Sequence, residues 1–204
     1  MQKTPVVVVD IETTGLSPYR HKITEIAAAK IINGKVVDKF EQLVNPKVKI
    51  SSFITKLTGI TNDLVEDSPE IQDVMPSFRK FLGDHTFVAH NASFDFKFLA
   101  YNMKSYEERY LDNTTLCTQK LANRILPDLH SKRLGVICEH YGITNNQAHR
   151  AMGDTLATVN IFDKMIKTLE KYKITKIQEV INFERMPRSK ASDFLFNNQK
   201  PHRE

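Results

Sequence analysis

Apolar residues open the chain with four valines at positions 6–9, with Pro5 before them and polar residues after them. A short β-branched run of this kind predicts a strand that is buried on both faces. Two more strand-like runs, residues 22–32 and 35–44, are separated only by Asn33 and Gly34. Asn-Gly between two such runs is the strongest short-range signal for a β-hairpin. The hairpin predicts that one strand pair of the sheet is antiparallel.

Helical spacing of apolar residues dominates the rest of the chain. A glycine follows three of these segments, at Gly59, Gly83 and Gly142, where helices commonly end. A brief strand is expected at residues 87–89, and Ser93 is expected to be the N-cap of the helix that follows it. Helices are expected at residues 51–58, 69–82, 93–103, 115–125, 131–141, 150–172 and 174–183. Early strands with helices interleaved and following predict an α/β domain with a mixed sheet.

Composition is that of an ordinary globular domain, with 41% hydrophobic and 26% charged residues. No apolar run is long enough to span a membrane, and no secretory signal opens the chain, so no membrane association is expected. The two cysteines, Cys117 and Cys138, lie far apart and form no metal-binding or disulfide pattern. A cytoplasmic protein with free thiols is the simplest interpretation.

Positive charge is concentrated at the C-terminal end. Residues 171–204 carry eight Lys or Arg against four acids, which is +4 of the net charge of +5. The chain is therefore divided into a domain over residues 1–170 and a basic extension over residues 171–204, with one helix and, from Met186, a poorly ordered tail. Such an extension suits contact with a polyanion or an acidic partner, although a merely solvated tail explains it equally well.

The first candidate for chemistry is Asp10-Ile11-Glu12, at the end of the valine strand. Residues two apart in a strand point to the same face, so the two carboxylates repel each other beside a buried strand. A hard divalent cation would compensate them, whereas an isolated Asp-x-Glu is usually a solvated pair. The full run Asp-x-Glu-Thr-Thr-Gly is expected by chance on the order of 10⁻⁴ times in such a chain. The turn at Thr13, Thr14 and Gly15 supplies hydroxyls and N–H groups that suit a phosphate. Leu16, the next residue, supplies an apolar surface for a base.

Two further segments carry candidate groups. Asp95 lies in the first turn of an expected helix, where the helix dipole alone also explains an acid. His149 and Asp154 are five residues apart, so His149 is expected in the loop before the helix, although a lone histidine is more often structural. Together, four acids and one histidine are the inventory for two-metal hydrolysis of a phosphodiester, with His149 as general base.

These three segments, in this order and spacing, resemble the DEDD superfamily of 3′→5′ exonucleases, in the branch that uses histidine. Residues 54–61 and the Tyr-Gly-Ile at 141–143 are similar to the proofreading epsilon-type exonucleases of bacterial replicative DNA polymerases. The resemblance covers residues 5–168 and implies a ribonuclease-H-like fold, two Mg²⁺ or Mn²⁺ ions per site, and release of nucleoside monophosphates from single-stranded or frayed DNA 3′ ends. It makes the metal ligands Asp10, Glu12, Asp95 and Asp154, the general base His149, and the nucleotide-binding residues Thr13, Thr14, Gly15, Leu16, His90, Asn91 and Phe94.

Three alternatives stay open at this point. A DNA proofreading enzyme, alone or as a polymerase subunit, is preferred. An RNA or oligoribonucleotide 3′→5′ exonuclease uses the same chemistry and differs in contacts to the 2′-OH. An inactive nucleic-acid-binding module would need none of the five catalytic residue types. Residues 171–204 are expected to contact a polymerase subunit or, through the apolar triplet at residues 194–196, a sliding clamp.

Overall fold

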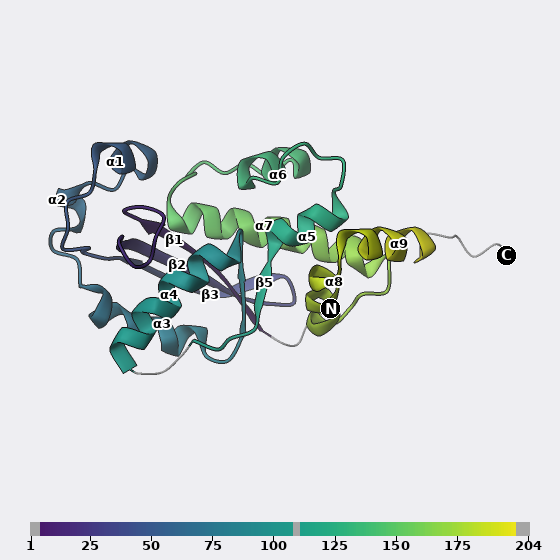
Figure 1. Ribbon diagram of the computed structural model, residues 1–204, viewed down its shortest axis with the longest axis horizontal. Coiled ribbons are helices and arrows are strands. Elements are labelled where there is room, and N and C mark those ends of the chain that lie inside the picture. Colours follow the sequence, from purple (N-terminus) through teal and green to yellow (C-terminus); the bar gives the residue numbers. More distant parts are fainter. Residues whose placement is uncertain (1–4, 108–110, 199–204) are drawn as a thin grey trace.

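A computed structural model describes residues 5–107 and 111–198, apart from the side chains of residues 105–107. Its centre is a five-stranded sheet with the strand order β3-β2-β1-β4-β5 (Figure 1). β1 pairs antiparallel with β2 and parallel with β4, and β4 pairs parallel with β5, so the sheet is mixed as predicted. The strands are β1 (Val6–Thr13), β2 (Ile23–Ile32), β3 (Lys35–Leu43), β4 (Thr86–Ala89) and β5 (Thr115–Cys117).

The valine run is the middle strand of this sheet because its side chains fill the core on both faces. Val6 and Val8 pack into one apolar cluster, and Val7 and Val9 pack into another. All four side chains are 0% exposed, as expected for a strand covered on both faces. The strand continues past the valines to Thr13, so it carries Asp10 and Glu12 at its far end.

The predicted hairpin is present, with β2 and β3 joined by Asn33 and Gly34. Their φ angles are 53° and 72°, which is the left-handed conformation that a two-residue type I′ turn requires at both positions. Asn and Gly adopt this conformation more readily than other residues, and therefore this dipeptide determines where the chain reverses.

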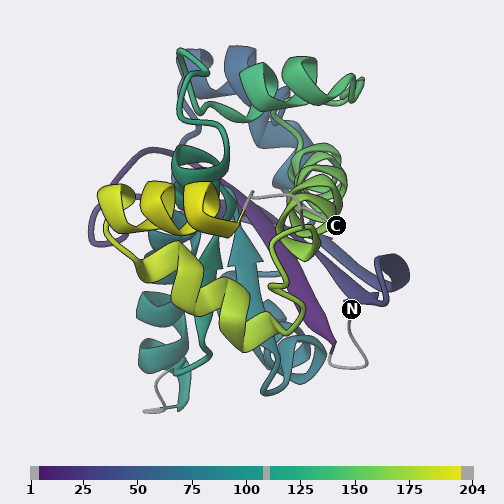
Figure 2. The same cartoon turned by 90° about the vertical axis from the view of Figure 1, so that its right-hand side faces the viewer.

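Helices cover both faces of the sheet (Figure 2). One face packs on α3 (Ile71–Leu82) and α4 (Ala92–Glu107), whose buried side chains include Phe78 and Phe98. The other face packs on α7 (Ala151–Glu170), with α5 (Thr118–Ile125) and α6 (Leu134–Tyr141) beside it. Two short helices, α1 (Ser52–Thr58) and α2 (Asn62–Val65), follow β3 and enclose a small cluster of their own. This α/β arrangement matches the predicted ribonuclease-H-like architecture.

Two local predictions were wrong. Residues 115–117 form strand β5, not the start of a helix, because their backbone pairs with β4. Ser93 is not an N-cap, because α4 begins one residue before it, at Ala92. Asn91 precedes the helix with a φ of 64°, so the sharp turn into α4 is made there.

The C-terminal part is more ordered than the polar sequence suggested. After α8 (Ile177–Arg185), residues predicted to be poorly ordered form α9 (Arg188–Asn198). Ala191 is fully buried, and the ring of Phe194 lies 5.9 Å from that of Phe183. α9 therefore packs on α5 and, through Phe194, on α8. Residues 199–204 lie outside the described part of the chain. Within the described residues, no helix combines the length and apolar character needed to cross a membrane.

Candidate active site

Three carboxylates meet at the end of β1. Asp10 and Glu12 lie two apart on that strand, and Asp154 lies in the first turn of α7. One oxygen from each carboxylate lies within 4.8 Å of the others. Segments 142 residues apart in sequence are thus brought together because α7 packs directly on the sheet. The arrangement is suited to one or more hard cations with oxygen ligands.

Asp95 reaches the same place from the opposite side of the sheet. It lies in the first turn of α4 and is only 3% exposed. Its Oδ1 accepts a hydrogen bond of 3.2 Å from the backbone N–H of Ile11, between Asp10 and Glu12. The acid is therefore held against β1 itself, and its charge acts directly on Asp10.

The site is electrostatically strained without a cation. Burial raises the pKa of Asp10 well above its usual range, and the charges of Asp95 and Asp154 raise it further. Burial also raises the pKa of Glu12 to about 8, with Asp154 and Glu25 adding to the effect, and raises the pKa of Asp95 to about 8. These acids lie so close together that they retain protons near neutral pH. A bound metal ion would offset the repulsion between their charges and so lower their pKa values. The residues present fit a divalent metal site.

The loop before α7 holds Asp154 in place. The Nδ2 group of Asn145 donates a 2.6 Å hydrogen bond to Oδ1 of Asp154, and the backbone N–H of His149 donates one of 3.2 Å to Oδ2. Burial raises the pKa of Asp154, while these two hydrogen bonds lower it. His149 lies outside the helix with a φ of 63°, as its spacing from Asp154 predicted, and its side chain is exposed. Asn145 carried no signal in the sequence.

A buried ion pair lies behind the cluster. Glu25 faces Glu12 across the β1–β2 pairing and is 0% exposed. The Arg150 guanidinium contacts its carboxylate, with Nη2 at 2.6 Å from Oε1. The backbone N–H of Ala151, the first residue of α7, donates a 2.9 Å hydrogen bond to Oε2. The sequence gives no indication of this pairing of Glu25 with Arg150, since the pair forms only through tertiary contact.

The turn after β1 has a tight internal structure. The Thr13 hydroxyl donates to the carbonyl of Gly15 at 2.6 Å, and the Thr14 hydroxyl accepts from the N–H of Lys22 at 3.0 Å. A Cβ at Gly15 would lie 2.3 Å from the ring of His21, so a larger residue fits there only if that ring moves. Leu16 follows this turn and is 84% exposed, which leaves an apolar side chain in solvent four residues after Glu12 in the chain. Its predicted contact with a base stays a prediction.

The second predicted nucleotide-binding segment divides into two parts. Both ring nitrogens of His90 have partners within the protein, the Thr118 hydroxyl at 3.0 Å and the Lys132 carbonyl at 2.9 Å. Burial lowers the pKa of His90 to about 4, so the ring is neutral at physiological pH. The ring thus ties β4 to the segment before α6, and its contact with a nucleotide stays a prediction.

Asn91 and Phe94, in contrast, open onto a surface hollow of about 1,010 Å³ that Leu16 also lines. The Phe94 ring packs on that of Phe98, with 5.0 Å between centroids. Three of the predicted nucleotide-binding residues therefore share one hollow, and one of them, Phe94, directly precedes Asp95 in the chain.

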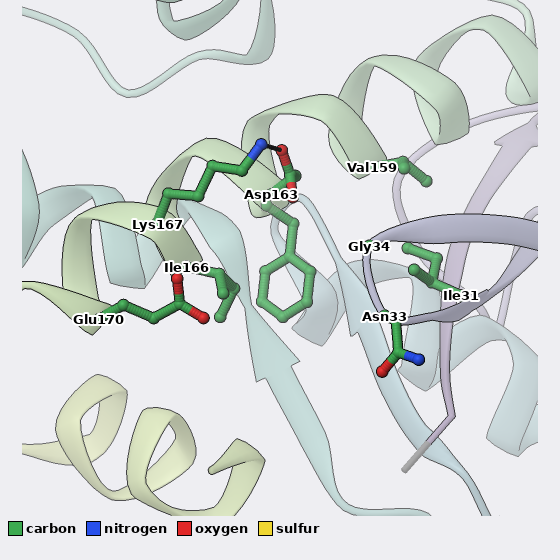
Figure 3. A pocket seen from close by; sticks show the side chains of 9 residues that line it. Ile31, Asn33, Gly34, Val159, Asp163, Ile166, Lys167 and Glu170 are labelled. Carbon is green, nitrogen blue, oxygen red and sulfur yellow. Dashed lines mark hydrogen bonds and ion pairs between the residues drawn. The ribbon is translucent and has the colours of Figure 1, made fainter. Parts of the chain in front are cut away.

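A smaller pocket of about 240 Å³ lies between the β2–β3 turn and α7 (Figure 3). Its lining includes Phe162 and Ile166, and its rim carries the ion pair between Lys167 and Asp163, whose charged atoms are 2.6 Å apart. None of the predicted site residues lines this pocket, so the chemistry is assigned to the carboxylate cluster.

Sequence comparison identifies the relatives of this chain. The exonuclease family model matches residues 7–162. PolC-type DNA polymerase III of Caldanaerobacter subterraneus subsp. tengcongensis is 43% identical over 174 residues, which are 85% of this chain and 12% of that protein. The PolC-type DNA polymerase III of Bacillus subtilis is 41% identical over 169 residues, again covering 12% of its length. The chain thus spans about one eighth of these curated relatives.

Solved structures give a consistent picture. Exonuclease X in complex with 5′ overhanging duplex DNA has a TM-score of 0.68 and 26% identity, with 93% of this chain and 98% of that chain covered. The nuclease domain of 3′hExo, a DEDDh family member bound to rAMP, has a TM-score of 0.70 at 20% identity, with 80% and 92% covered, and shows the fold. The family match, the fold and the convergence of all three motifs agree. The chain belongs to the exonuclease family whose model matches residues 7–162.

Proposed function

We propose that this domain removes nucleotides from single-stranded or frayed DNA 3′ ends in a reaction that depends on a divalent metal. The observation that carries the proposal is the meeting of Asp10, Glu12 and Asp154 within 4.8 Å, with Asp95 hydrogen-bonded to β1 between them. The similarity to PolC-type DNA polymerases III supports a proofreading role in DNA replication. A basic extension from residue 171 onward would then contact a polymerase subunit, a sliding clamp or the DNA itself.

Charge balance supports two Mg²⁺ or Mn²⁺ ions held by Asp10, Glu12, Asp95 and Asp154. Arg150 neutralises Glu25, and the four remaining carboxylates match the charge of two divalent cations. When bound, such ions lower the pKa of an attacking water and stabilise the leaving 3′ oxygen of a phosphodiester. The carboxylates themselves have a single task, which is to stay ionised and aligned at the end of β1.

His149 serves as the general base in this proposal. Its backbone N–H is bonded to Asp154, so the ring is carried at the edge of the carboxylate cluster, and the side chain is exposed to water. A base in this position takes the proton from the attacking water, a role that typically contributes about 10²–10⁴ in rate. Leu16 and Phe94 supply apolar surface for bases, which favours unpaired ends and gives little sequence preference.

The test is release of mononucleotides from 3′-labelled single strands of DNA and RNA, with and without Mg²⁺ or Mn²⁺. The expected result is metal-dependent release from DNA ends, faster than from RNA ends, by the wild type and none above background by Asp154→Asn. Faster release from RNA than from DNA would show that RNA is the preferred substrate. Binding of both strands without release from either would make the domain a binding module and overturn the proposal.

A further inference from the structure

The hollow that Leu16 and Phe94 line extends well beyond these two residues. We name it the α4 groove, bounded by the loop at residues 16–19 and by one side of α4. Leu16 and Phe94 line it, and so do two tyrosines and two lysines, Tyr19, Tyr101, Lys97 and Lys104. No acidic side chain is among the described residues that line the groove. Its surface is therefore aromatic and basic and continuous with the proposed nucleotide-binding residues.

The outer residues form an ordered row. Lys97, Tyr101 and Lys104 are spaced by four and three residues, so they share one face of α4. At 1.5 Å per residue, they extend the groove by about 10 Å along the helix. All three side chains are exposed, and thus two ammonium groups flank an aromatic ring on a solvent-facing surface.

Tyr19 faces this row from the loop after β1. Its side chain is 78% exposed, and its ring lies 5.3 Å from that of Tyr101 in an edge-on arrangement. The Tyr101 side chain is 40% exposed, so both rings keep surface on which a base can stack. Basic side chains interleaved with aromatic rings are the usual features of single-strand binding, where bases stack and phosphates pair with lysine.

We propose that the α4 groove binds the two or three nucleotides upstream of the scissile bond in single-stranded DNA. Tyr19 and Tyr101 stack on bases, and Lys97 and Lys104 contact phosphates. The length of about 10 Å corresponds to about three nucleotides at 3.4 Å each in a stacked strand. This inference rests on the proposed function, which places the terminal nucleotide at the inner end of the groove.

The experiment measures kcat/KM of the full chain on single-stranded DNA of two to ten nucleotides. For the wild type, kcat/KM is expected to rise with length up to about five nucleotides and then level off. Tyr19→Ala should lose at least about fivefold on strands of five nucleotides or more, and little on a dinucleotide. Tyr19→Trp should retain the wild-type length dependence, because it keeps a stacking surface.

The lysines are tested by salt dependence. The slope is that of the logarithm of binding affinity for long strands against the logarithm of salt concentration. Removing two phosphate contacts in Lys97→Gln/Lys104→Gln should make this slope shallower by about 1.4. Lys80→Gln/Lys164→Gln is the matched control, since it removes the same charge from exposed lysines that do not line the groove. This control should keep the wild-type slope.

Two results would overturn the α4 groove as an upstream site: no rise of wild-type kcat/KM beyond two nucleotides, or an equal loss by the variants at every length. If the wild type released nucleotides from no strand, the proposed function would fail. Binding at the groove would then be tested by fluorescence anisotropy with an eight-nucleotide strand. Equal affinities of the wild type and Lys97→Gln/Lys104→Gln would overturn the proposal. Weaker binding by Lys97→Gln/Lys104→Gln, with wild-type binding by the control Lys80→Gln/Lys164→Gln, would support it.

Discussion

At the scale of single residues, the site is a balance of charges. Five acids gather around the end of β1, and one of them, Glu25, is neutralised by Arg150. The same carboxylate accepts the N–H of Ala151, so it fixes the start of α7 two residues after His149. The ion pair thereby separates a structural acid from the four that we propose as metal ligands, and it anchors the segment that carries His149, the proposed general base.

Arg150→Gln should therefore weaken both folding and catalysis. It leaves the Glu25 carboxylate buried without its counter-ion, which should lower the free energy of unfolding by about 2 kcal/mol, below the range for fully buried pairs because the Arg150 side chain is 38% exposed. kcat should fall about tenfold or more as the loop shifts. Urea unfolding and steady-state kinetics measure the two effects.

The matched control is Lys167→Gln, which breaks the exposed ion pair with Asp163 on the same helix. It should change neither the urea midpoint nor kcat, because exposed pairs contribute little. Equal effects of the two substitutions would refute a special role for the pair of Glu25 and Arg150.

At the scale of elements, the junction of the loop at residues 144–149 with α7 decides where His149 and Asp154 lie. A glycine makes this junction possible. A Cβ at Gly153 would lie 2.2 Å from the carbonyl oxygen of Gln147, a contact that real structures do not tolerate. Glycine costs a helix interior about 1 kcal/mol relative to alanine, so its presence in α7 reflects the close approach of the loop.

Gly153→Ala should therefore lower activity despite its better helix propensity. The loop must move away from α7, which should reduce kcat by about tenfold to a hundredfold and reduce the melting temperature. Gly135→Ala in α6 is the control, because no atom lies within 4 Å of the Cβ that it adds. The control should be as active as the wild type and at least as stable. Full activity of Gly153→Ala would show that the loop position is unimportant.

At the scale of the whole molecule, a helix on each face of the sheet places one acid near β1. α4 brings Asp95 from one face, and α7 brings Asp154 from the other. Both helices hold their acids at the N-terminal turn, where the helix dipole favours negative charge. The buried carboxylates still cost folding free energy, so the metal-free fold should be sensitive to pH.

The metal-free protein should lose stability as pH rises from about 6.5 to 8. The folded pKa values of Glu12 and Asp95, about 8, lie above their ordinary values. The folded state therefore keeps protons that the unfolded chain has released in this window, and stability falls as pH increases. Below pH 6.5, His90 makes stability rise with pH, because its folded pKa is lowered to about 4 and the unfolded chain binds the proton first. Thermal unfolding in chelator at several pH values measures the slope, and a flat or rising curve would contradict it.

Much of this molecule could be predicted from the sequence where local chemistry decides the structure. The valine run and the Asn33-Gly34 turn produced the predicted strands, and the three motifs contained the four acids and His149. Features that depend on tertiary contact were missed. β5 has only three residues and is defined by its pairing with β4, and Asn145 gains its role through contact with Asp154.

The tail shows the same limit. Its composition is polar, but Ala191 is buried and the Phe194 ring contacts that of Phe183 in α8, so a helix forms where disorder was predicted. Whether the chain divides functionally at residue 170 stays a prediction. Amphipathic segments of low overall hydrophobicity depend on a neighbouring surface, which composition alone does not reveal.

The most direct test of the account is Asp10→Asn, with stability and activity measured on the same preparation. If the acids are held together for metal-dependent catalysis, this variant should melt at a higher temperature than the wild type in chelator, because one source of repulsion is gone. It should also lose most of the stabilisation by Mn²⁺ and release no nucleotides above background, while still binding single-stranded DNA. A variant that melts lower in chelator and retains near-normal nucleotide release would contradict the account.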